Sequence, residues 1–448
     1  MPVADAVRRD RSATAETHSR FAEMSEFWAW LAERREASPY HIETVGLDRL
    51  DAWHREPNSA DLVHRSRRFF AIRGLRVSTD HRKVTGWTQP IIDQPEVGIL
   101  GILTHTFDGI PHYLMQAKME PGNINGLQLS PTVQATYSNY TGVHRGAAVH
   151  YLEYFLDRGR SRVVYDALQS EQGAWFLGKR NRNMIVEASG DIPVHENFCW
   201  LTREQLVRLL REDNLLNMDS RSVLSGITGE THSTDNGPAL HSTTQLLSWL
   251  TETRSRYRLD RQVIALSALD GWVSSPDRIR RDDGRFFEII GVDVTATHRE
   301  VSRWSQPMLA PCGRGLNAFL GRRIADRFHL LVQARTEAGT FDVVELGPTV
   351  SCIPDNYRAL PPDRQPRFLD VALAAGPGQV LFDAVHSEEG GRLYHAENRY
   401  LIADVGEGFP LDVPDDYLWI TPAQLAGLAR YGNVVDVAAR SLLTCLAL

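Results

Sequence analysis

The chain carries the same long sequence pattern twice. Arg68 to Gly74, which reads Arg-Phe-Phe-Ala-Ile-Arg-Gly, returns 217 positions later as Arg285 to Gly291, which reads Arg-Phe-Phe-Glu-Ile-Ile-Gly. Towards the end of each copy the displacement becomes 219, as from Arg221 to Arg440. A repeat of this length is a duplicated domain and not one unit of a solenoid. The sequence therefore predicts two similar domains, and the question becomes which copy carries the chemistry.

The length of 448 residues suits two such copies, each large enough for its own core. We expect a loose polar tail over residues 1–24, a first copy over 25–225, a linker rich in Gly, Ser, Thr and His over 226–243, and a second copy over 244–448. Strand-like and helical patterns mix within each copy, which is typical of an α/β or α+β domain. We predict the α+β class: two tandem domains with mixed β-sheets flanked by helices.

Individual elements follow from local patterns. Apolar residues at helical spacing predict a helix over Glu26–Glu36. Thr202 with Gln205, and Thr421 with Gln424, have the spacing of a capping box that opens a helix. Strand-like runs occupy residues 73–79, 97–103, 112–119 and 124–129, and a turn at 121–123 separates the last two.

Composition excludes several classes of protein. The net charge of −7 and pI near 6.2 give no reason to expect nucleic acid as a partner. We expect no membrane span and no secretory signal, because the chain contains no long apolar run. The 4 cysteines form no paired motif, which favours reduced thiols and a cytoplasmic location. Dinucleotide, Walker, zinc-peptidase and nucleophile-elbow motifs are missing, and Lys83, Lys118 and Lys179 are the only lysines, so a pyridoxal-phosphate enzyme is not expected.

Residues 118–136 are dense in amides, hydroxyls and one Lys–Glu pair. At strand period, Gln128, Ser130, Thr132 and Gln134 share one face. Such a face suits sugar hydroxyls or a pyrimidine edge, and an ordinary solvent-facing strand is the alternative.

A second polar segment places Lys179, Arg180 and Arg182 after a turn. Arginine pairs bidentately with a pyrophosphate, although a solvated surface would read the same way. His81-Arg82 recurs as His298-Arg299, which fits either a proton-transfer or a structural role. Trp87, like Trp304, is expected in the core or in the wall of a pocket.

These segments carry a resemblance to a known family. The runs from Leu127 to Thr136, from Ser138 to Thr141, from Gln169 to Gly173 and from Lys179 to Asn183 closely resemble the NDP-hexose 2,3-dehydratases of deoxysugar and antibiotic biosynthesis. The resemblance implies a Nudix-like fold in each half, a homodimer and no cofactor. It also implies a hydro-lyase that acts on dTDP-4-keto-6-deoxyglucose, removing water across C2 and C3 to give a 3,4-diketo-2,6-dideoxy sugar for an NADPH-dependent 3-ketoreductase.

The Nudix relation suggests what the chain has lost. The hydrolase motif lies on a helix and holds divalent metal with three glutamates, and we align it with residues 166–173 and 383–390. Only Glu171 of the three remains in the first copy. Because a hard cation needs several oxygen ligands, we expect no metal site. A Nudix-type nucleotide-sugar hydrolase and a non-catalytic dTDP-sugar binding protein remain the alternatives.

Candidate site residues follow from the resemblance and from differences between the copies. Five polar positions of the first copy, Asn123, Gln134, Thr136, Lys179 and Arg180, become Thr340, Ser351, Ile353, Ala396 and Glu397 in the second. Glu397 would repel phosphates, so the first copy is predicted to hold the active pocket and the second a structural or vestigial one. Proton transfer is assigned, in falling order, to Glu120, Lys118, His81 and Tyr140. Substrate binding is assigned to Arg82, Trp87, Gln89, Asn123, Gln128, Thr132, Gln134, Lys179, Arg180 and Arg182.

Overall fold

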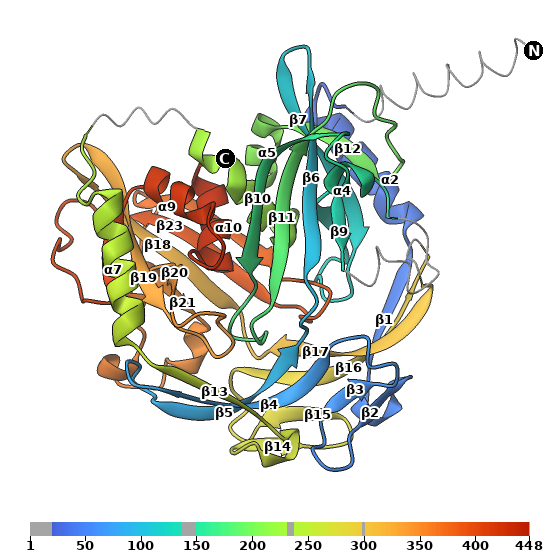
Figure 1. Cartoon of the computed structure of the whole chain (residues 1–448), viewed down its shortest axis with the longest axis vertical. Helices are drawn as coiled ribbons and strands as arrows, with labels where there is room; N and C mark the ends of the chain where they lie inside the picture. The colour runs from blue at the N-terminus through green and yellow to red at the C-terminus, as the bar shows by residue number, and fades with distance from the viewer. Residues whose placement is uncertain (1–19, 137–148, 231–236, 298–300, 448) are drawn as a thin grey trace, which may run out of the picture.

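Four β-sheets with a small number of helices make up the protein. The computed structural model describes residues 20–136, 149–230, 237–297 and 301–447. Two seven-stranded and two five-stranded sheets form in this part of the chain. In Figure 1 the seven-stranded sheets stand side by side in the upper part, and the five-stranded sheets lie below them. The α+β class predicted from the sequence is confirmed.

The elements of the first copy are the helices α2 (Met24–Ala37), α4 (Glu153–Leu156), α5 (Arg203–Leu209) and α6 (Met218–Leu224), the 3-10 helices η1 (Leu47–Arg49) and η2 (Ser225–Glu230), and the strands β1 (Tyr40–Val45), β2 (Trp53–Arg55), β3 (Leu62–His64), β4 (Ala71–Thr79), β5 (Gly86–Asp93), β6 (Gly98–Phe107), β7 (Ile110–Met119), β8 (Leu127–Ser130), β9 (Val133–Ala135), β10 (Arg162–Ser170), β11 (Arg180–Glu187) and β12 (Phe198–Thr202).

The elements of the second copy are the helices α7 (Thr243–Arg256), α8 (Leu369–Ala374), α9 (Pro422–Ala429) and α10 (Val437–Ala447), the 3-10 helices η3 (Leu266–Ala268), η4 (Pro354–Asn356) and η5 (Pro362–Arg364), and the strands β13 (Leu259–Ile264), β14 (Trp272–Ser274), β15 (Arg278–Arg281), β16 (Phe287–Ala296), β17 (Arg303–Pro311), β18 (Gly315–Ile324), β19 (Arg327–Arg335), β20 (Glu345–Gly347), β21 (Val350–Cys352), β22 (Val380–Ser387), β23 (Glu397–Asp404) and β24 (Tyr417–Ile420).

Several helices and strands begin where local sequence patterns predict them. The predicted first helix is α2, which buries Phe27, Trp30 and Leu31 on one side. Both predicted capping boxes form, at the starts of α5 and α9, where a threonine side chain accepts a hydrogen bond from the third backbone N–H of the helix. The strand predicted over 124–129 begins only at Leu127, because residues 121–126 make a turn that ends at Gly126 with a φ of 69°.

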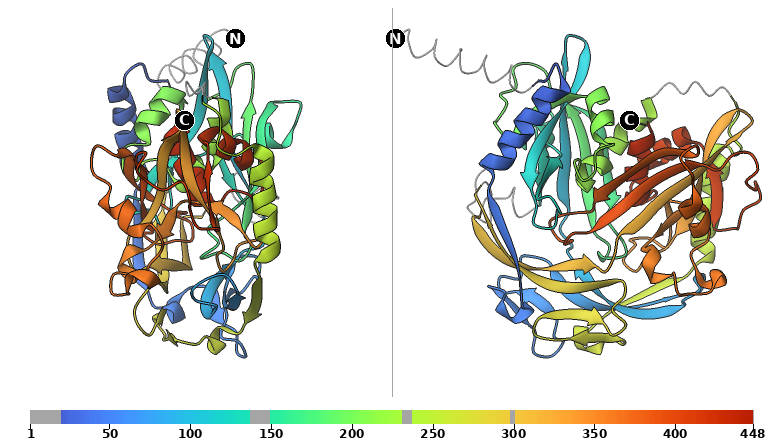
Figure 2. Two further views of the ribbon diagram at one scale, coloured as in Figure 1. Left: turned by 90° about the vertical axis from the view of Figure 1, so that its left-hand side faces the viewer. Right: turned by 180° about the vertical axis from the view of Figure 1, so that it is seen from behind.

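The two copies exchange strands. β1 of the first copy pairs antiparallel with β16 of the second, with Thr44 opposite Val292. β13 of the second copy pairs antiparallel with β4 of the first, with Arg76 opposite Gln262. Each five-stranded sheet therefore takes four strands from one copy and one from the other. Figure 2 shows β1 running down alongside the strands of the second copy when the molecule is seen from behind.

Two buried arginines tie the copies together with the same bonds in both directions. The side chains of Arg221 and Arg440 are both 0% exposed. Arg221 donates to the carbonyl oxygen of Ser387 at 2.9 Å, and Arg440 donates to the carbonyl oxygen of Ser170 at 2.6 Å. Each copy thus uses its arginine to hold the end of the other copy's strand β22 or β10. These contacts relate the copies by an approximate twofold.

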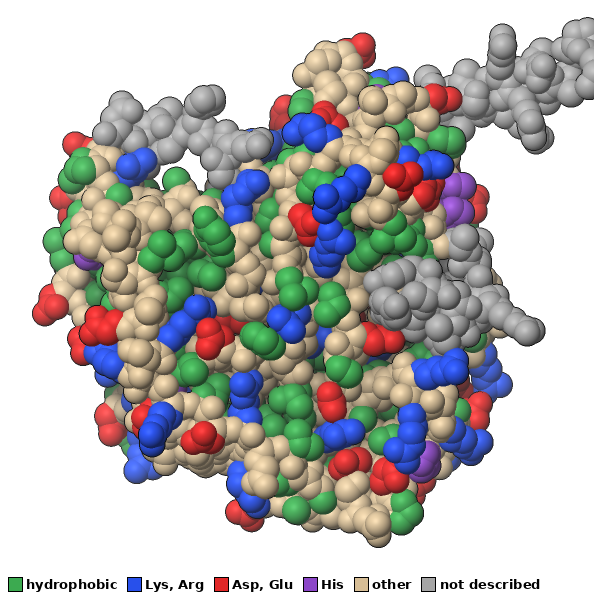
Figure 3. Space-filling view, viewed as in Figure 1, with side chains coloured by type: hydrophobic (Ala, Val, Ile, Leu, Met, Phe, Trp, Pro, Cys, Tyr) green, Lys and Arg blue, Asp and Glu red, His purple; other side chains and the backbone are tan. Residues whose placement is uncertain are grey.

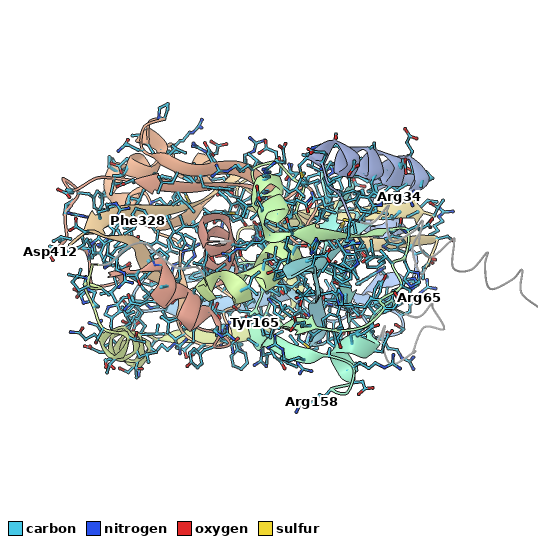
Figure 4. The ribbon with its side chains drawn as sticks, turned by 90° about the horizontal axis from the view of Figure 1, so that it is seen from above. Arg34, Arg65, Arg158, Tyr165, Phe328 and Asp412 are labelled. Carbon is cyan, nitrogen blue, oxygen red and sulfur yellow. The ribbon has the colours of Figure 1, made fainter. Side chains whose placement is uncertain are left out.

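The largest apolar core also crosses the boundary, since it joins residues of both copies. Tyr165, which lies near this boundary in Figure 4, donates its hydroxyl hydrogen to the carbonyl oxygen of Ala429 at 3.2 Å. On the face shown in Figure 3, acidic and basic side chains are interspersed. The 3-10 helix η2 buries Ile227 and Thr228, so packed structure extends into the segment predicted as the linker.

The predicted alignment with the Nudix motif is wrong. Residues 166–170 lie in strand β10 and residues 383–387 lie in strand β22. A helix is required to place the three glutamates of that motif on one side, whereas a strand sends successive side chains to opposite faces. The surviving Glu171 therefore belongs to a different arrangement, described below.

Candidate functional site

A lysine, an amide and a carboxylate form a chain of hydrogen bonds at the end of strand β7. Lys118 Nζ donates to Gln134 Oε1 at 3.0 Å, and Gln134 Nε2 donates to Glu120 Oε1 at 2.6 Å. The amide orientation fits an ammonium on one side and an anion on the other. Glu120 is only 3% exposed, so the relay holds a carboxylate inside the protein.

The turn after Glu120 is docked on the second copy. The N–H of Gly122 donates to the carbonyl oxygen of Gly390 at 2.7 Å, and the N–H of His395 donates to the carbonyl oxygen of Gly122 at 2.8 Å. A Cβ atom on Gly122 would stand 1.8 Å from the carbonyl oxygen of Leu393. Only glycine allows this approach of two backbones, which brings a loop of the second copy against Glu120.

This loop carries another carboxyl group into the site. Both oxygens of Glu389 accept backbone hydrogen bonds, from Gly391 at 3.0 Å and from Arg392 at 2.8 Å. A Cβ atom on the neighbouring Gly390 would lie 2.9 Å from the Cβ of Glu120. Burial, and then the charge of Glu120, raise the pKa of Glu389 to about 7. The second copy thus completes the surroundings of Glu120.

Two further carboxyl groups of the first copy belong to the same charged group. Asp219, in the first turn of α6, is 3% exposed, and burial together with the charges of Glu171, Glu120 and Glu389 raises its pKa well above the usual range. Burial also raises the pKa of Glu171, whose Oε1 accepts a hydrogen bond from Asn181 at 2.7 Å. We call Lys118, Glu120, Gln134, Glu171, Asp219 and Glu389 the first cluster.

Several acceptor atoms of the first cluster have no donor in the part of the chain that the structure describes. They are Glu120 Oε2, Glu171 Oε2, Asp219 Oδ1 and, beside the cluster, Asn123 Oδ1. Buried acceptors without partners are costly. Donors such as sugar hydroxyls or carboxyl protons would satisfy them, and a site that must bind a polyhydroxy ligand needs such acceptors.

The equivalent positions of the second copy are closed by a direct ion pair. Arg335 Nε and Nη2 donate to Glu337 Oε1 at 2.9 and 2.7 Å. Arg335 and Glu337 correspond to Lys118 and Glu120, and Ser351 stands where the first copy has Gln134. Burial raises the pKa of Asp436 here to about 7. We call Arg335, Glu337, Glu345 and Asp436 the second cluster.

Three predicted site residues, His81, Arg82 and Trp87, contact the second copy, and a fourth, Gln89, is bonded to Trp87 and to the first copy. His81 Nε2 is 2.7 Å from Thr336 Oγ1, and Arg82 Nη1 donates to the carbonyl oxygen of Thr336 at 3.0 Å. Trp87 packs with Ala338, and Gln89 donates to the carbonyl oxygen of Ala174 at 2.8 Å. The strand exchange explains this: β4 and β5 of the first copy are placed against the second copy. The assignment of His81 to proton transfer, and of Arg82, Trp87 and Gln89 to substrate binding, stays a prediction.

Other predicted residues have structural partners. Thr132 Oγ1 accepts from the N–H of Leu103 at 2.9 Å and donates to the carbonyl of Leu114, and Thr349 repeats this bridge in the second copy. Gln128 Nε2 donates to Ser387 Oγ at 2.8 Å. Thr132 thus joins strands within its own sheet, and Gln128 joins the two copies.

The three predicted cations, Lys179, Arg180 and Arg182, lie in different surroundings. Lys179 is buried and donates to the carbonyl of Glu96; burial lowers its pKa, and Glu171 and Glu389 are among the charges that act on it. The Arg180 guanidinium instead stacks 3.8 Å from the ring centre of Phe341, in the second copy. Arg182 forms a bidentate pair with Asp166 at 2.8 and 2.5 Å, partly exposed to solvent.

The contacts of Glu397 give no support to the charge-reversal argument for the second pocket, which stays a prediction. Glu397 Oε1 accepts a hydrogen bond from Asn214 of the first copy at 2.5 Å, and its other oxygen is 3.3 Å from Arg314. Glu397 therefore faces the first copy and not the second cluster. Tyr140 lies outside the described residues, as do His298 and Arg299.

Sequence reasoning missed Asp219 and Glu389. Both differ between the copies, since Asp219 corresponds to Ala438 and Glu389 to Gln172. A full comparison at both displacements would have found them. It could not have shown that Glu389 acts with the first copy.

Features elsewhere bear less on this site. A cavity away from the first cluster is lined by Arg20, His105, Phe107, Gly190, Asp191, Ile192, Val194 and Trp200. In the described ranges, no group of three or more His, Cys, Asp or Glu side chains is arranged to hold a metal ion. No helix there is long and apolar enough to cross a membrane.

The fold and the first cluster define a class: a duplicated protein with a buried carboxylate–lysine site suited to acid–base chemistry. The model of one family, NDP-hexose 2,3-dehydratase, matches residues 24–227 and again residues 243–446. The chain belongs to this family. The resemblance drawn from the sequence, including the duplication, is therefore confirmed.

Relatives from three bacteria are similar over almost their whole length, and each is named a dTDP-4-dehydro-6-deoxy-alpha-D-glucopyranose 2,3-dehydratase. The relative from Streptomyces violaceoruber is 56% identical over 95% of this chain and 97% of its own. The one from Amycolatopsis orientalis is 48% identical over 93% and 89%, and the one from Saccharopolyspora spinosa is 45% identical over 94% and 91%.

Proposed function

We propose that this protein is a dTDP-4-keto-6-deoxy-D-glucose 2,3-dehydratase of deoxysugar biosynthesis and that the first cluster is its active site. The observation that carries the assignment to this cluster is the contrast between Glu120 and Glu337. Glu120 Oε1 accepts from the neutral amide of Gln134, and its buried Oε2 has no donor in the described part of the chain, whereas Glu337 Oε1 accepts two hydrogen bonds from the Arg335 guanidinium.

The substrate needs only acid–base help. Its C4 ketone acidifies the C3 hydrogen, so Glu120 removes a proton from C3 and the electron pair moves towards O4. Lys118, the cation of the relay, stabilises the negative charge that develops there. The electron pair then returns from O4 and expels the C2 hydroxyl, which takes up a proton and leaves as water. The remaining 2,3-enol becomes the 3,4-diketo-2,6-dideoxy sugar, and atoms and electrons balance without a redox partner.

Other residues are assigned to binding. Asn123 and Gln134 stand beside Glu120 and suit sugar hydroxyls, and Lys179 is the cation we assign to the pyrophosphate. Its electrostatic interactions with Glu171 and Glu389 support a place near the cluster. Tyr140 stays a candidate for proton transfer.

Wider properties follow from the family. We propose a cytoplasmic homodimer with a Nudix-like fold in each half, whose product passes to an NADPH-dependent 3-ketoreductase. The supporting observations are the mixed sheets of each half and the long likeness to the three relatives.

A coupled assay tests the function. The protein is incubated with dTDP-4-keto-6-deoxyglucose, a 3-ketoreductase and NADPH, with and without EDTA. We expect NADPH consumption that requires both enzymes and does not change with EDTA. Release of a sugar phosphate that EDTA abolishes would instead indicate the nucleotide-sugar hydrolase. Binding without any exchange of the C3 hydrogen in deuterated water would indicate a non-catalytic protein.

A further inference from the structure

Three carboxyl groups of the first cluster, those of Glu171, Asp219 and Glu389, have no part in the proposed reaction, and the last two are found only in this cluster. Asp219 comes from helix α6 of the first copy, and Glu389 comes from the loop after β22 of the second. Neither has a carboxyl counterpart at the matching position of the other copy, where Ala438 and Gln172 stand. These two carboxyl groups are therefore a feature of the first cluster and are not required by the fold that the copies share.

The geometry near Asp219 favours an uncharged acid. The side chain is 3% exposed, and its Oδ1 has no hydrogen-bond partner among the described residues. The charged groups that act on it are Glu171, Glu120, Glu389 and Lys118, so three carboxyl groups and one cation face it. An ionised Asp219 would be a buried anion among anions, which is strongly unfavourable.

Glu389 shows the same conflict through the symmetry of the fold. Its counterpart Gln172 donates an amide hydrogen to Glu388 Oε2 at 2.8 Å. The charge of Glu171 raises the pKa of Glu389, and the charge and backbone N–H of Arg392 act in the opposite direction. A carboxylate cannot donate as the amide of Gln172 does, so Glu389 needs a proton to act as a donor in the same way.

We propose that Asp219 and Glu389 are positioning residues that stay protonated in the resting enzyme and so keep the negative charge of the first cluster on Glu120. This inference rests on the proposed function and deepens it. Glu120 remains a base because its neighbours hold protons. Glu120 takes one proton from C3, and one proton leaves with the C2 hydroxyl as water. Asp219 and Glu389 therefore end each turnover with the protons that they held at its start.

A pH profile separates this role from a structural one. Burial and Glu120 raise the pKa of Glu389 to about 7, so Glu389 loses its proton as the pH rises through this value. A second negative charge then opposes formation of the enolate. We expect kcat/KM of the unchanged enzyme to fall at least fivefold from pH 6.5 to pH 8.5. In Glu389→Gln the fall should be less than twofold.

Asp219→Asn and a matched control complete the experiment. Asp219→Asn copies the neutral acid, so kcat/KM at pH 6.5 should drop no more than about fivefold, and the infrared band of a protonated carboxyl should lose intensity. Asp436→Asn replaces a buried carboxyl of the second cluster by asparagine. Asn217 is the residue at the matching position of the first copy. The Asp436→Asn variant should leave both kcat/KM and the profile unchanged.

Three results would overturn the proposal while leaving dehydration itself established. One is an alkaline fall that persists in Glu389→Gln. Another is a loss of more than a hundredfold in Asp219→Asn with a folded protein by circular dichroism, since this would make Asp219 a required anion. The third is an equal change in Asp436→Asn. If the unchanged enzyme does not dehydrate the sugar, it is the proposed function that fails.

Discussion

The two clusters share one frame and differ in how a carboxylate is held. In the second cluster Arg335 contacts Glu337 directly through two nitrogens. In the first, Gln134 stands between Lys118 and Glu120, so cation and anion are held apart. Two hydrogen bonds from the Arg335 guanidinium pair the Glu337 carboxylate with a cation, whereas the neutral amide of Gln134 fixes Glu120 without pairing it directly with one. The difference teaches that a few side chains decide which copy of a duplicated fold can react.

The largest effect should come from the carboxylate itself. Glu120→Gln removes the proposed base, and loss of general-base assistance costs about 10²–10⁴ in kcat. Glu337→Gln, the same change in the second cluster, should alter kcat less than threefold. The coupled NADPH assay measures both. Equal losses in the two variants would show that the clusters are not functionally distinct.

Replacing the relay by the residue of the other copy should have the next largest effect. Gln134→Ser removes the donor to Glu120 and lets Lys118 approach it. A hydrogen bond to a charged group is worth about 1.5–3 kcal/mol, which corresponds to a loss of roughly ten- to a hundredfold in kcat/KM. The reverse change, Ser351→Gln, should leave the rate as it was. Unaltered kinetics in Gln134→Ser would remove the relay from the mechanism.

The docked turns of the two copies should respond equally to substitution of their glycines. A Cβ atom on Gly122 or on Gly339 would stand 1.8 Å from a carbonyl oxygen, that of Leu393 or of Phe176. Overpacking of this kind costs about 1–3 kcal/mol or more, so Gly122→Ala and Gly339→Ala should both lower the Tm in thermal unfolding. A large loss in only one variant would contradict the approximate twofold at the docked turns.

The smallest effect should come from the outer ion pairs. Arg182 with Asp166, and Arg399 with Asp383, are matching bidentate pairs that are partly exposed. Exposed pairs contribute about 0–1 kcal/mol. Arg182→Ala and Arg399→Ala should therefore change stability slightly and to the same extent, with kcat/KM retained. A selective rise of KM in Arg182→Ala would restore the original assignment of Arg182 to the pyrophosphate.

Most of the fold and part of the site could be predicted from the sequence. Periodicity and capping boxes predicted α2, α5 and α9, and the duplication predicted two similar halves. Lys118, Glu120 and Gln134 were chosen together because they lie within one segment, and they do meet. Local patterns contain no information about partners across a sheet, however.

Long-range pairing therefore could not be predicted from these patterns. His81 was assigned to proton transfer and Arg82 to substrate binding in the pocket of the first copy. Strand exchange sends them to Thr336 of the second copy instead. Glu389 was missed for the converse reason, since it lies far along the chain and reaches the first cluster only through the docked turn at Gly122.

The exchange of β1 and β13 has a consequence for biosynthesis. Arg76 and Gln262, which lie opposite each other in the register of β4 and β13, are 186 residues apart along the chain. While the ribosome makes that stretch, the edge of β4 waits without its final neighbour and is open to association with other nascent chains. A gene cut between the copies would yield two polypeptides, each able to mature only by trading a strand with the other.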